Sequence, residues 1–355
     1  MQDNFVYDTA LERRGWIREA GGRCARIFLA LLAFELISGA AVYGFSFMLA
    51  IFDPDTYLLV ADDVVFNILL SSVPMYLIAF PVLYLIIRKM KVHRPVKTKL
   101  EPGELLLALF VAEALMLAGN YVGLTLMSFV EGILGQPIPD NTADLISEAP
   151  IWLLAVIVVA IGPIVEELIF RKLFIDRLRV HGDLYAIIVS SVAFGIFHQN
   201  IYQLFYATLL GFLLGYLYIK SGDIKMPIII HMIINLLGSI VGLFVQEKTD
   251  ILYEILETVD EMGPSAELPY ETAFALFDSI GAVLSYAMLT YGMAIAGIVI
   301  IILAFVKKQI KLSKTPPLPL DAGGLAEATL LNVGAILFLV LSFIMTVSNV
   351  LLPLL

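Results

Sequence analysis

The sequence contains a single cysteine, Cys24, only four histidines and few charged residues, 15% of 355. One cysteine excludes an intramolecular disulfide and a metal cluster held by several thiolates. The scarcity of charge excludes an ordinary soluble domain, in which about 25% of residues are charged. With 60% hydrophobic residues and a mean hydropathy of +0.92, the composition is that of a polytopic membrane protein.

Long apolar runs recur along the chain and predict an all-α, polytopic bundle of transmembrane helices, since a crossing helix needs about 20 mostly apolar residues. The runs cover residues 27–52, 64–87, 105–130, 151–175, 184–198, 201–219, 227–245, 281–306 and 328–353. The fifth and sixth runs are short and only Gln199 and Asn200 separate them. Non-helical backbone is tolerated inside a membrane where it lines a cavity, so a hairpin is an alternative to two crossings. We therefore expect eight or nine spans, or seven plus a hairpin.

Basic residues lie in alternate linkers. Groups of arginine and lysine precede the first run and follow the second, fourth, sixth and eighth. By the positive-inside rule these linkers and the N-terminus are cytoplasmic. The opposite linkers are acidic and account for most of the net charge of -10. This charge therefore gives no indication of nucleic-acid binding, and we expect none; the lipid bilayer is the expected environment.

The spans and linkers suggest four parts. Residues 1–104 form a cytoplasmic segment with two transmembrane helices, residues 105–245 a central core, residues 246–280 an acidic extracytoplasmic loop, and residues 281–355 two further transmembrane helices. Apolar residues at helical spacing from Asp250 to Met262 predict a short amphipathic helix within the loop. The proline-rich stretch at residues 313–319 predicts an extended cytoplasmic tether.

Six polar or ionisable residues interrupt the apolar helices of the central core. They are Glu166, Glu167, Arg171, His198, His231 and Asn235. A charge in hydrocarbon costs at least about 3 kcal/mol, so such residues usually face a cavity and have a function there. Carboxylates, imidazoles and an amide are the groups that activation of water at a carbonyl requires. The pattern therefore predicts an intramembrane hydrolase.

The two adjacent glutamates have different expected roles. Glu167 and Arg171 are four residues apart on one helix face, with the glutamate on the N-terminal side, which favours a structural ion pair. Glu166 is rotated by about 100° from Glu167 and has no basic residue three or four positions away. An unpaired carboxylate in a low-dielectric wall suits general acid and base chemistry. The alternative role for Glu166 is structural: a protonated side chain that forms a hydrogen bond with a neighbouring helix.

His231 and Asn235 share one face of an apolar helix, which is costly unless something polar lies opposite. Together with Glu166 and His198 they allow two chemistries. In one, Glu166 and His198 polarise a water while His231 and Asn235 donate hydrogen bonds to the oxyanion. In the other, Glu166, His198 and His231 ligate zinc, which lowers the pKa of its bound water. The residue types leave both open; we favour zinc, because a carboxylate with two imidazoles is a sufficient ligand set.

Other polar and small residues have simpler explanations. Glu113 and Asn120, in the third run, are expected to form hydrogen bonds between helices, with a role in a proton path or a substrate groove as the alternative. Gly211 and Gly215 are four residues apart in the sixth run and predict a face where two helices pack closely.

The spacings resemble the CPBP family of intramembrane proteases, which includes the CAAX-processing endopeptidase, bacteriocin-processing and self-immunity proteins, and lysostaphin-resistance-like proteins. The motifs are Glu166-Glu167-x-x-x-Arg171, Phe194-x-x-x-His198 and His231-x-x-x-Asn235, in that order on successive helices. The resemblance covers about residues 105–245. It implies an intramembrane endopeptidase, with or without a metal, in which the first glutamate and the two histidines are catalytic. The asparagine assists, and the second glutamate and the arginine support the first motif.

The leading hypothesis is therefore an intramembrane (metallo)endopeptidase that cuts a membrane-associated protein or peptide near the cytoplasmic side of the bilayer. We expect it in the plasma membrane of a prokaryote. An ion-coupled transporter is the main alternative, but it predicts inverted repeats with broken helices, and the sequence has no internal repeat. A catalytically silent immunity protein is a third possibility, although every motif position is intact.

Overall fold

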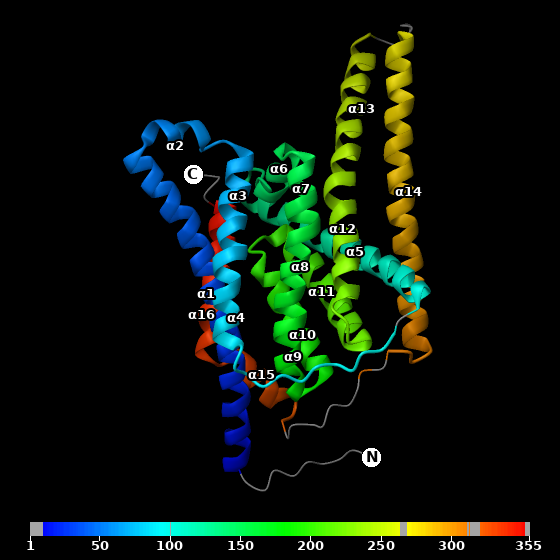
Figure 1. Ribbon diagram of the computed structural model, residues 1–355. Coiled ribbons are helices and arrows are strands. Elements are labelled where there is room, and N and C mark those ends of the chain that lie inside the picture. The colour runs from blue at the N-terminus through cyan, green and yellow to red at the C-terminus, as the bar shows by residue number, and fades with distance from the viewer. Residues whose placement is uncertain (1–9, 100, 263–267, 311, 313–319, 352–355) are drawn as a thin grey trace.

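The computed structural model describes residues 10–99, 101–262, 268–310, 312 and 320–351, and within these residues all regular structure is helical (Figure 1). The first half contains α1 (Ala10–Phe52), α2 (Pro54–Val60), α3 (Val64–Pro74), η1 (Met75–Ala79), α4 (Phe80–Ile87), α5 (Pro102–Leu134), α6 (Asn141–Glu148), α7 (Ile151–Leu154), η2 (Ala155–Ile161), α8 (Gly162–Glu167) and η3 (Leu168–Ile175). The second half contains α9 (Asp176–Leu178), η4 (Arg179–His181), α10 (Asp183–Phe197), α11 (Ile201–Ser221), α12 (Lys225–Leu236), η5 (Leu237–Val241), α13 (Gly242–Met262), α14 (Tyr270–Val306), α15 (Ala322–Leu330) and α16 (Val333–Leu351).

Eight continuous helical segments of the described chain are long and apolar enough to cross a membrane, which confirms the expected all-α polytopic bundle. They are Glu12–Phe52, Val64–Ile87, Pro102–Leu134, Ile151–His181, Ile201–Ser221, Lys225–Met262, Tyr270–Val306 and Val333–Leu351. The fifth apolar run, residues 184–198, forms α10, which has 15 residues and a length of about 22 Å at 1.5 Å per residue. The protein is therefore an integral membrane protein with eight candidate spans and one shorter apolar helix.

The linkers predicted to be cytoplasmic meet at one end of the bundle. Arg23 Nη1 on α1 donates to the carbonyl of Lys91. The backbone N–H of His93 donates to the carbonyl of Asp176 at 2.6 Å, and Thr98 N–H donates to Ser221 at 2.8 Å. The start of α1, the segment after α4 and the ends of η3 and α11 thus lie together. This clustering agrees with the charge alternation along the sequence.

The turn between α10 and α11 contacts the segment before α6 and the end of α16. Asn200 caps α11 and donates from Nδ2 to Asp140 Oδ1 at 3.0 Å. Asn349, near the end of α16, donates to the carbonyl of Gln199 at 3.1 Å. Gln199 adopts a φ of 51°, which lets the chain reverse over three residues. The linker before α6 and the end of α16 therefore hold this turn, and α10, with 15 residues, is shorter than a full crossing needs.

The expected acidic loop at residues 246–280 is helical in its described part. α12, η5 and α13 form one continuous helical segment that extends to Met262, and α14 already begins at Tyr270. The two helices stand side by side beyond the rest of the bundle (Figure 1). Lys248 Nζ on α13 binds Asp278 Oδ2 on α14 at 2.6 Å, and Ile255 is buried. The apolar residues that predict a short surface helix thus extend a transmembrane helix that packs beside α14.

The last apolar run, predicted as one span from residue 328, is also different in the structure. It is divided between α15, which packs against α1, and α16. Asn332 lies at the break, where its Oδ1 accepts a hydrogen bond from Ala335 N–H at 2.9 Å. This side chain caps the first turn of α16 and stops α15 from continuing. The proline-rich stretch at 313–319 lies outside the described residues.

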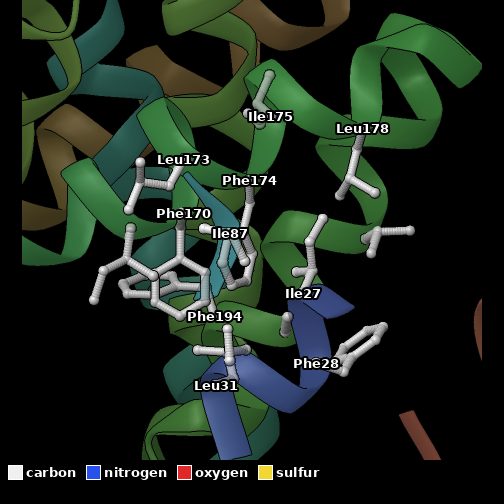
Figure 2. Packing of buried hydrophobic residues seen from close by; sticks show 14 of the residues in the cluster. Ile27, Phe28, Leu31, Ile87, Phe170, Leu173, Phe174, Ile175, Leu178 and Phe194 are labelled. Carbon is white, nitrogen blue, oxygen red and sulfur yellow. The ribbon is translucent and has the colours of Figure 1, made fainter. Parts of the chain in front are cut away.

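A core of aromatic and aliphatic side chains holds η3 against α1, α4 and α10 (Figure 2). Phe170 is its centre: its ring lies edge-on to Phe194 at 5.0 Å and to Phe174 at 5.4 Å between centroids. Edge-to-face pairs of this kind add about 1 kcal/mol each beyond the burial of their area. Since Phe194 is one turn before His198 and Phe170 precedes Arg171, this core connects the first two motifs rigidly.

Small residues allow the central helices to approach closely, as predicted for Gly211 and Gly215. A Cβ on Gly211 would lie 3.1 Å from Ser191 Cα on α10, and one on Gly215 would lie 3.4 Å from Ile187 on the same helix. The crossing of α10 and α11 is tightest at Gly195, where an added Cβ would collide with Thr208 Oγ1. These glycines set the distance between the helix that carries His198 and α11.

We expect Gly195→Ala to separate α10 from α11 and to destabilise the protein by about 1–3 kcal/mol, the usual cost of overpacking. Thermal unfolding in detergent should show a lower midpoint. Gly281→Ala on α14 is the matched control, because a Cβ there meets no atom within 4 Å. That variant should be unchanged or slightly stabilised, since alanine favours helix by about 1 kcal/mol over glycine. Equal midpoints for the two variants would contradict the close crossing.

Candidate active site

The four predicted site residues Glu166, His198, His231 and Asn235 line one cavity of about 560 Å³ inside the bundle. Glu166 lies on α8, His198 follows the last turn of α10, and the other two lie on α12. π-helical segments flank α8 on both sides and a third, η5, follows α12. Such segments leave the regular hydrogen-bond ladder and are frequent at functional sites. The structure thus brings together residues that lie up to 69 positions apart in the sequence.

Glu167 holds two partners at once behind the cavity wall. Its Oε2 lies 2.9 Å from Arg171 Nε, and both side chains are fully buried, as the four-residue spacing predicts. Its Oε1 lies 3.0 Å from His231 Nδ1. Arg171 also places its guanidinium over the ring of Phe194, 4.8 Å from the centroid. Glu167 therefore connects the arginine of its own helix to the histidine of α12, a contact that the sequence did not indicate.

Glu166 faces the cavity, as its rotation from Glu167 predicts. Its side chain is 24% exposed, whereas that of Glu167 is 0% exposed. Its Oε2 lies 3.6 Å from His231 Nε2, slightly beyond ordinary hydrogen-bond length. His231 is thus placed between two carboxylates, one buried behind it and one in the cavity. Since a carboxylate accepts only, the ring N–H at Nδ1 donates to Glu167 and Nε2 is next to Glu166.

His198 is oriented by the backbone of its own helix. Its Nδ1 lies 2.8 Å from the carbonyl of Phe194, four residues earlier. A carbonyl only accepts hydrogen bonds, so Nδ1 must carry a proton, and the neutral ring has its lone pair at Nε2. The phenyl ring of Phe194 lies edge-on to the imidazole at 4.8 Å between centroids. The FxxxH motif thus sets the tautomer of the histidine and fixes its ring.

Asn235 differs in part from the expected role of an oxyanion donor. Its Nδ2 donates a hydrogen bond to the carbonyl of Val158 in η2 at 3.0 Å. The amide therefore joins α12 to the π-helical segment before the two glutamates. Its second N–H and its Oδ1 have no hydrogen bond in the described structure. Asn235 combines a structural contact with a free amide group in the wall of the cavity.

Zinc binding by Glu166, His198 and His231 is a prediction that depends on how these side chains lie. Among the described residues no group of three His, Cys, Asp or Glu side chains is close enough to hold a metal ion. Glu166, His198 and His231 share a cavity, and Nδ1 of each histidine is engaged, by the carbonyl of Phe194 and by Glu167. Nε2 of each ring is left available, as in histidines that bind a metal. The residue types suit zinc, while the described side-chain positions do not gather three donors, so metal binding stays a prediction.

Further polar residues line the cavity, and the sequence did not indicate them. Tyr76 on η1, Tyr206 on α11 and Tyr286 on α14 line it, as do Ser71 and Ser72 on α3. A Cβ on Gly162 would lie 3.5 Å from the hydroxyl of Tyr76, which places that hydroxyl against α8 one turn before Glu166. Serine and tyrosine are common in membrane helices, so their positions in the sequence carry little signal.

Comparison with known proteins points to one family. Residues 148–237 match the model of the family described as "Type II CAAX prenyl endopeptidase Rce1-like". Over 93 residues the chain is 36% identical to "Putative membrane peptidase YdiL" of Bacillus subtilis (strain 168), a match that covers 26% of this chain and 37% of that protein. It is 29% identical over 175 residues to "Membrane-embedded CAAX protease MroQ" of Staphylococcus aureus (strain USA300), covering 45% of this chain and 68% of that protein.

The matches cover only part of the molecule, and little more than a third of the Bacillus protein is spanned. No solved structure gives a significant match. The family match nevertheless contains all six polar residues, from Glu166 to Asn235. The resemblance that the three motifs indicate is thus confirmed for residues 148–237, which match the Rce1-like CAAX prenyl endopeptidase family.

Proposed function

We propose that the protein is an intramembrane endopeptidase that hydrolyses a peptide bond of a membrane-associated protein or peptide. The main support for this proposal is the cavity inside the bundle. It is lined by the partly exposed carboxylate of Glu166, the imidazoles of His198 and His231, and the amide of Asn235. Such a set can activate water and stabilise an oxyanion. The family match and the two bacterial relatives, both described as membrane proteases or peptidases, support the same activity.

Water activation is assigned to Glu166 and His198. A water between the Glu166 carboxylate and the lone pair of His198 Nε2 would lose a proton to the glutamate as its oxygen attacks the carbonyl carbon. His231, when protonated at Nε2, and the free N–H of Asn235 donate to the oxyanion that forms. Collapse of this intermediate breaks the C–N bond, and Glu166 returns the proton to the leaving amine. Glu167 keeps His231 in place through Nδ1.

The proposed reaction takes place within the bundle. Along their helices, Glu166 is about 15 Å from Asp176 and His198 is about 22 Å from Asp183, both at the basic end. We propose that this end is cytoplasmic, with the N-terminus on the same side, and that the protein resides in the plasma membrane of a prokaryote. The substrate reaches the cavity from the bilayer. One of the two relatives is described as a CAAX protease. A prenylated protein is therefore one candidate substrate.

A chelation experiment separates the metal-free reaction from the zinc alternative. We expect the purified protein to retain its cleavage of a membrane-anchored peptide after exhaustive chelation, because the described side chains do not gather a three-donor set. His231→Ala should lower turnover without changing the metal content measured by mass spectrometry. Activity that disappears on chelation and returns with zinc, at about one zinc per chain, would restore zinc as the catalyst.

A further inference from the structure

A second carboxyl group lines the cavity, and no group of the described residues binds it. Glu113 on α5 is only 7% exposed, yet it forms part of the cavity wall. The described structure gives it no hydrogen bond and no ion pair, so the interhelical bond expected from the sequence is not formed. Tyr286 on α14, which lines the same cavity, gives its hydroxyl hydrogen to the carbonyl of Leu237 at 3.2 Å. Glu113 is therefore aimed into the cavity without a partner.

Three other buried acids in the described structure are compensated, whereas the carboxylate oxygens of Glu35 on α1, which does not line the cavity, have no hydrogen-bond partner. Glu167 binds Arg171 and His231. Asp176 accepts from the hydroxyl of Tyr218 at 2.7 Å, and Asp183 binds Arg179 at 2.6 Å. A buried polar group without a hydrogen-bond partner destabilises the folded protein. Glu113 has no structural role in the described structure, which favours a function in binding.

The whole cavity has an acidic character. Among its described lining residues, two are carboxylates, Glu113 and Glu166, and none is lysine or arginine. Arg171 contributes no open charge, because it is fully buried behind Glu167. A ligand with a carboxylate would find no cation on this wall. A ligand with an amine or a guanidinium would find a carboxylate that is already desolvated and unpaired.

We propose that Glu113 is a specificity-determining residue that binds a lysine or arginine side chain of the peptide substrate. Asn120, two turns further along α5, lines the same cavity and offers a second polar contact. A charge-assisted bond in a desolvated site discriminates strongly against a substrate without the cation, because the carboxylate then stays unpaired. The inference rests on the proposed function and names its substrate class: a segment with a basic residue close to the scissile bond.

The test measures binding separately from cleavage. Membrane-anchored fluorescent peptides carry lysine or methionine at one scanned position, and they are titrated onto the Glu166→Gln protein in nanodiscs of zwitterionic lipid. Neutral lipid avoids attraction of the lysine peptide to the membrane surface. At one position or more, we expect the lysine peptide to have a Kd at least tenfold below that of its methionine counterpart. Adding Glu113→Gln should bring this ratio close to one, and Glu113→Asp should restore part of it.

Glu104→Gln is the matched control on the same helix, because Glu104 lies outside the cavity and pairs with Lys220 at 2.7 Å. It should leave the ratio unchanged. Equal affinity for both peptides at every position, or a lysine preference that persists in Glu113→Gln, would overturn the inference. Cleavage by the protein with Glu166 intact is scored separately. A Glu113-dependent preference without cleavage of any peptide would support the cation site and contradict the endopeptidase.

Discussion

Glu166→Gln is expected to lower kcat/KM for a membrane-anchored peptide by at least about 10³-fold, within the range that loss of a general base produces. Glutamine keeps the shape of the side chain but cannot take a proton from water. Glu166 forms no ion pair with an arginine or lysine in the described structure, and its side chain is partly open to the cavity. The variant should therefore fold with nearly the same yield and thermal midpoint as the unmodified protein.

The measurement compares initial rates in proteoliposomes with equal amounts of folded protein. Glu254→Gln, an exposed glutamate on α13 far along the sequence from the cavity, is the control and should keep full activity. If Glu166→Gln cleaved the peptide within tenfold of the unmodified rate, the carboxylate would not be the base. If it failed to fold, Glu166 would have a structural role that its open position does not suggest.

Much of the architecture follows from local patterns, which is why the sequence predicts it. The apolar runs require helices in a bilayer, and the spacing of Glu167 and Arg171 places them on one face whatever surrounds them. The close packing at Gly211 follows from the absence of a side chain. These features depend on residues within one or two helical turns, so a single sequence is sufficient to infer them.

Contacts between distant helices could not be inferred in this way. The bond between Glu167 and His231 depends on how α8 crosses α12, and the pattern of either helix is compatible with other crossings. The zinc prediction has the same limit: residue types define candidate ligands, but tertiary structure decides whether three of them meet. The extension of α13 depends likewise on its packing beside α14.

The second large effect concerns the buried pair of Glu167 and Arg171. Glu167→Gln should destabilise the protein by about 3–5 kcal/mol, the usual cost of leaving one member of a buried ion pair alone. The guanidinium nitrogens of Arg171 have no hydrogen bond in the described structure, and Glu167 is its ion-pair partner. Adding Arg171→Met removes the stranded charge, so Glu167→Gln/Arg171→Met should recover most of the lost stability in thermal or detergent unfolding.

A second double variant separates the ion pair from the contact with His231. Glutamine at 167 retains a carbonyl that accepts from His231 Nδ1, whereas leucine does not. Glu167→Leu/Arg171→Met should therefore be about 10–100-fold less active than Glu167→Gln/Arg171→Met, the usual effect of removing the partner that orients a site histidine. Both double variants lack the charges of Glu167 and Arg171. A comparison of their activities at equal folded fraction therefore isolates the effect of the hydrogen bond to His231. Equal activity of the two doubles would mean that Glu167 serves only Arg171, and that the geometry of His231 is set by the packing of α12 alone.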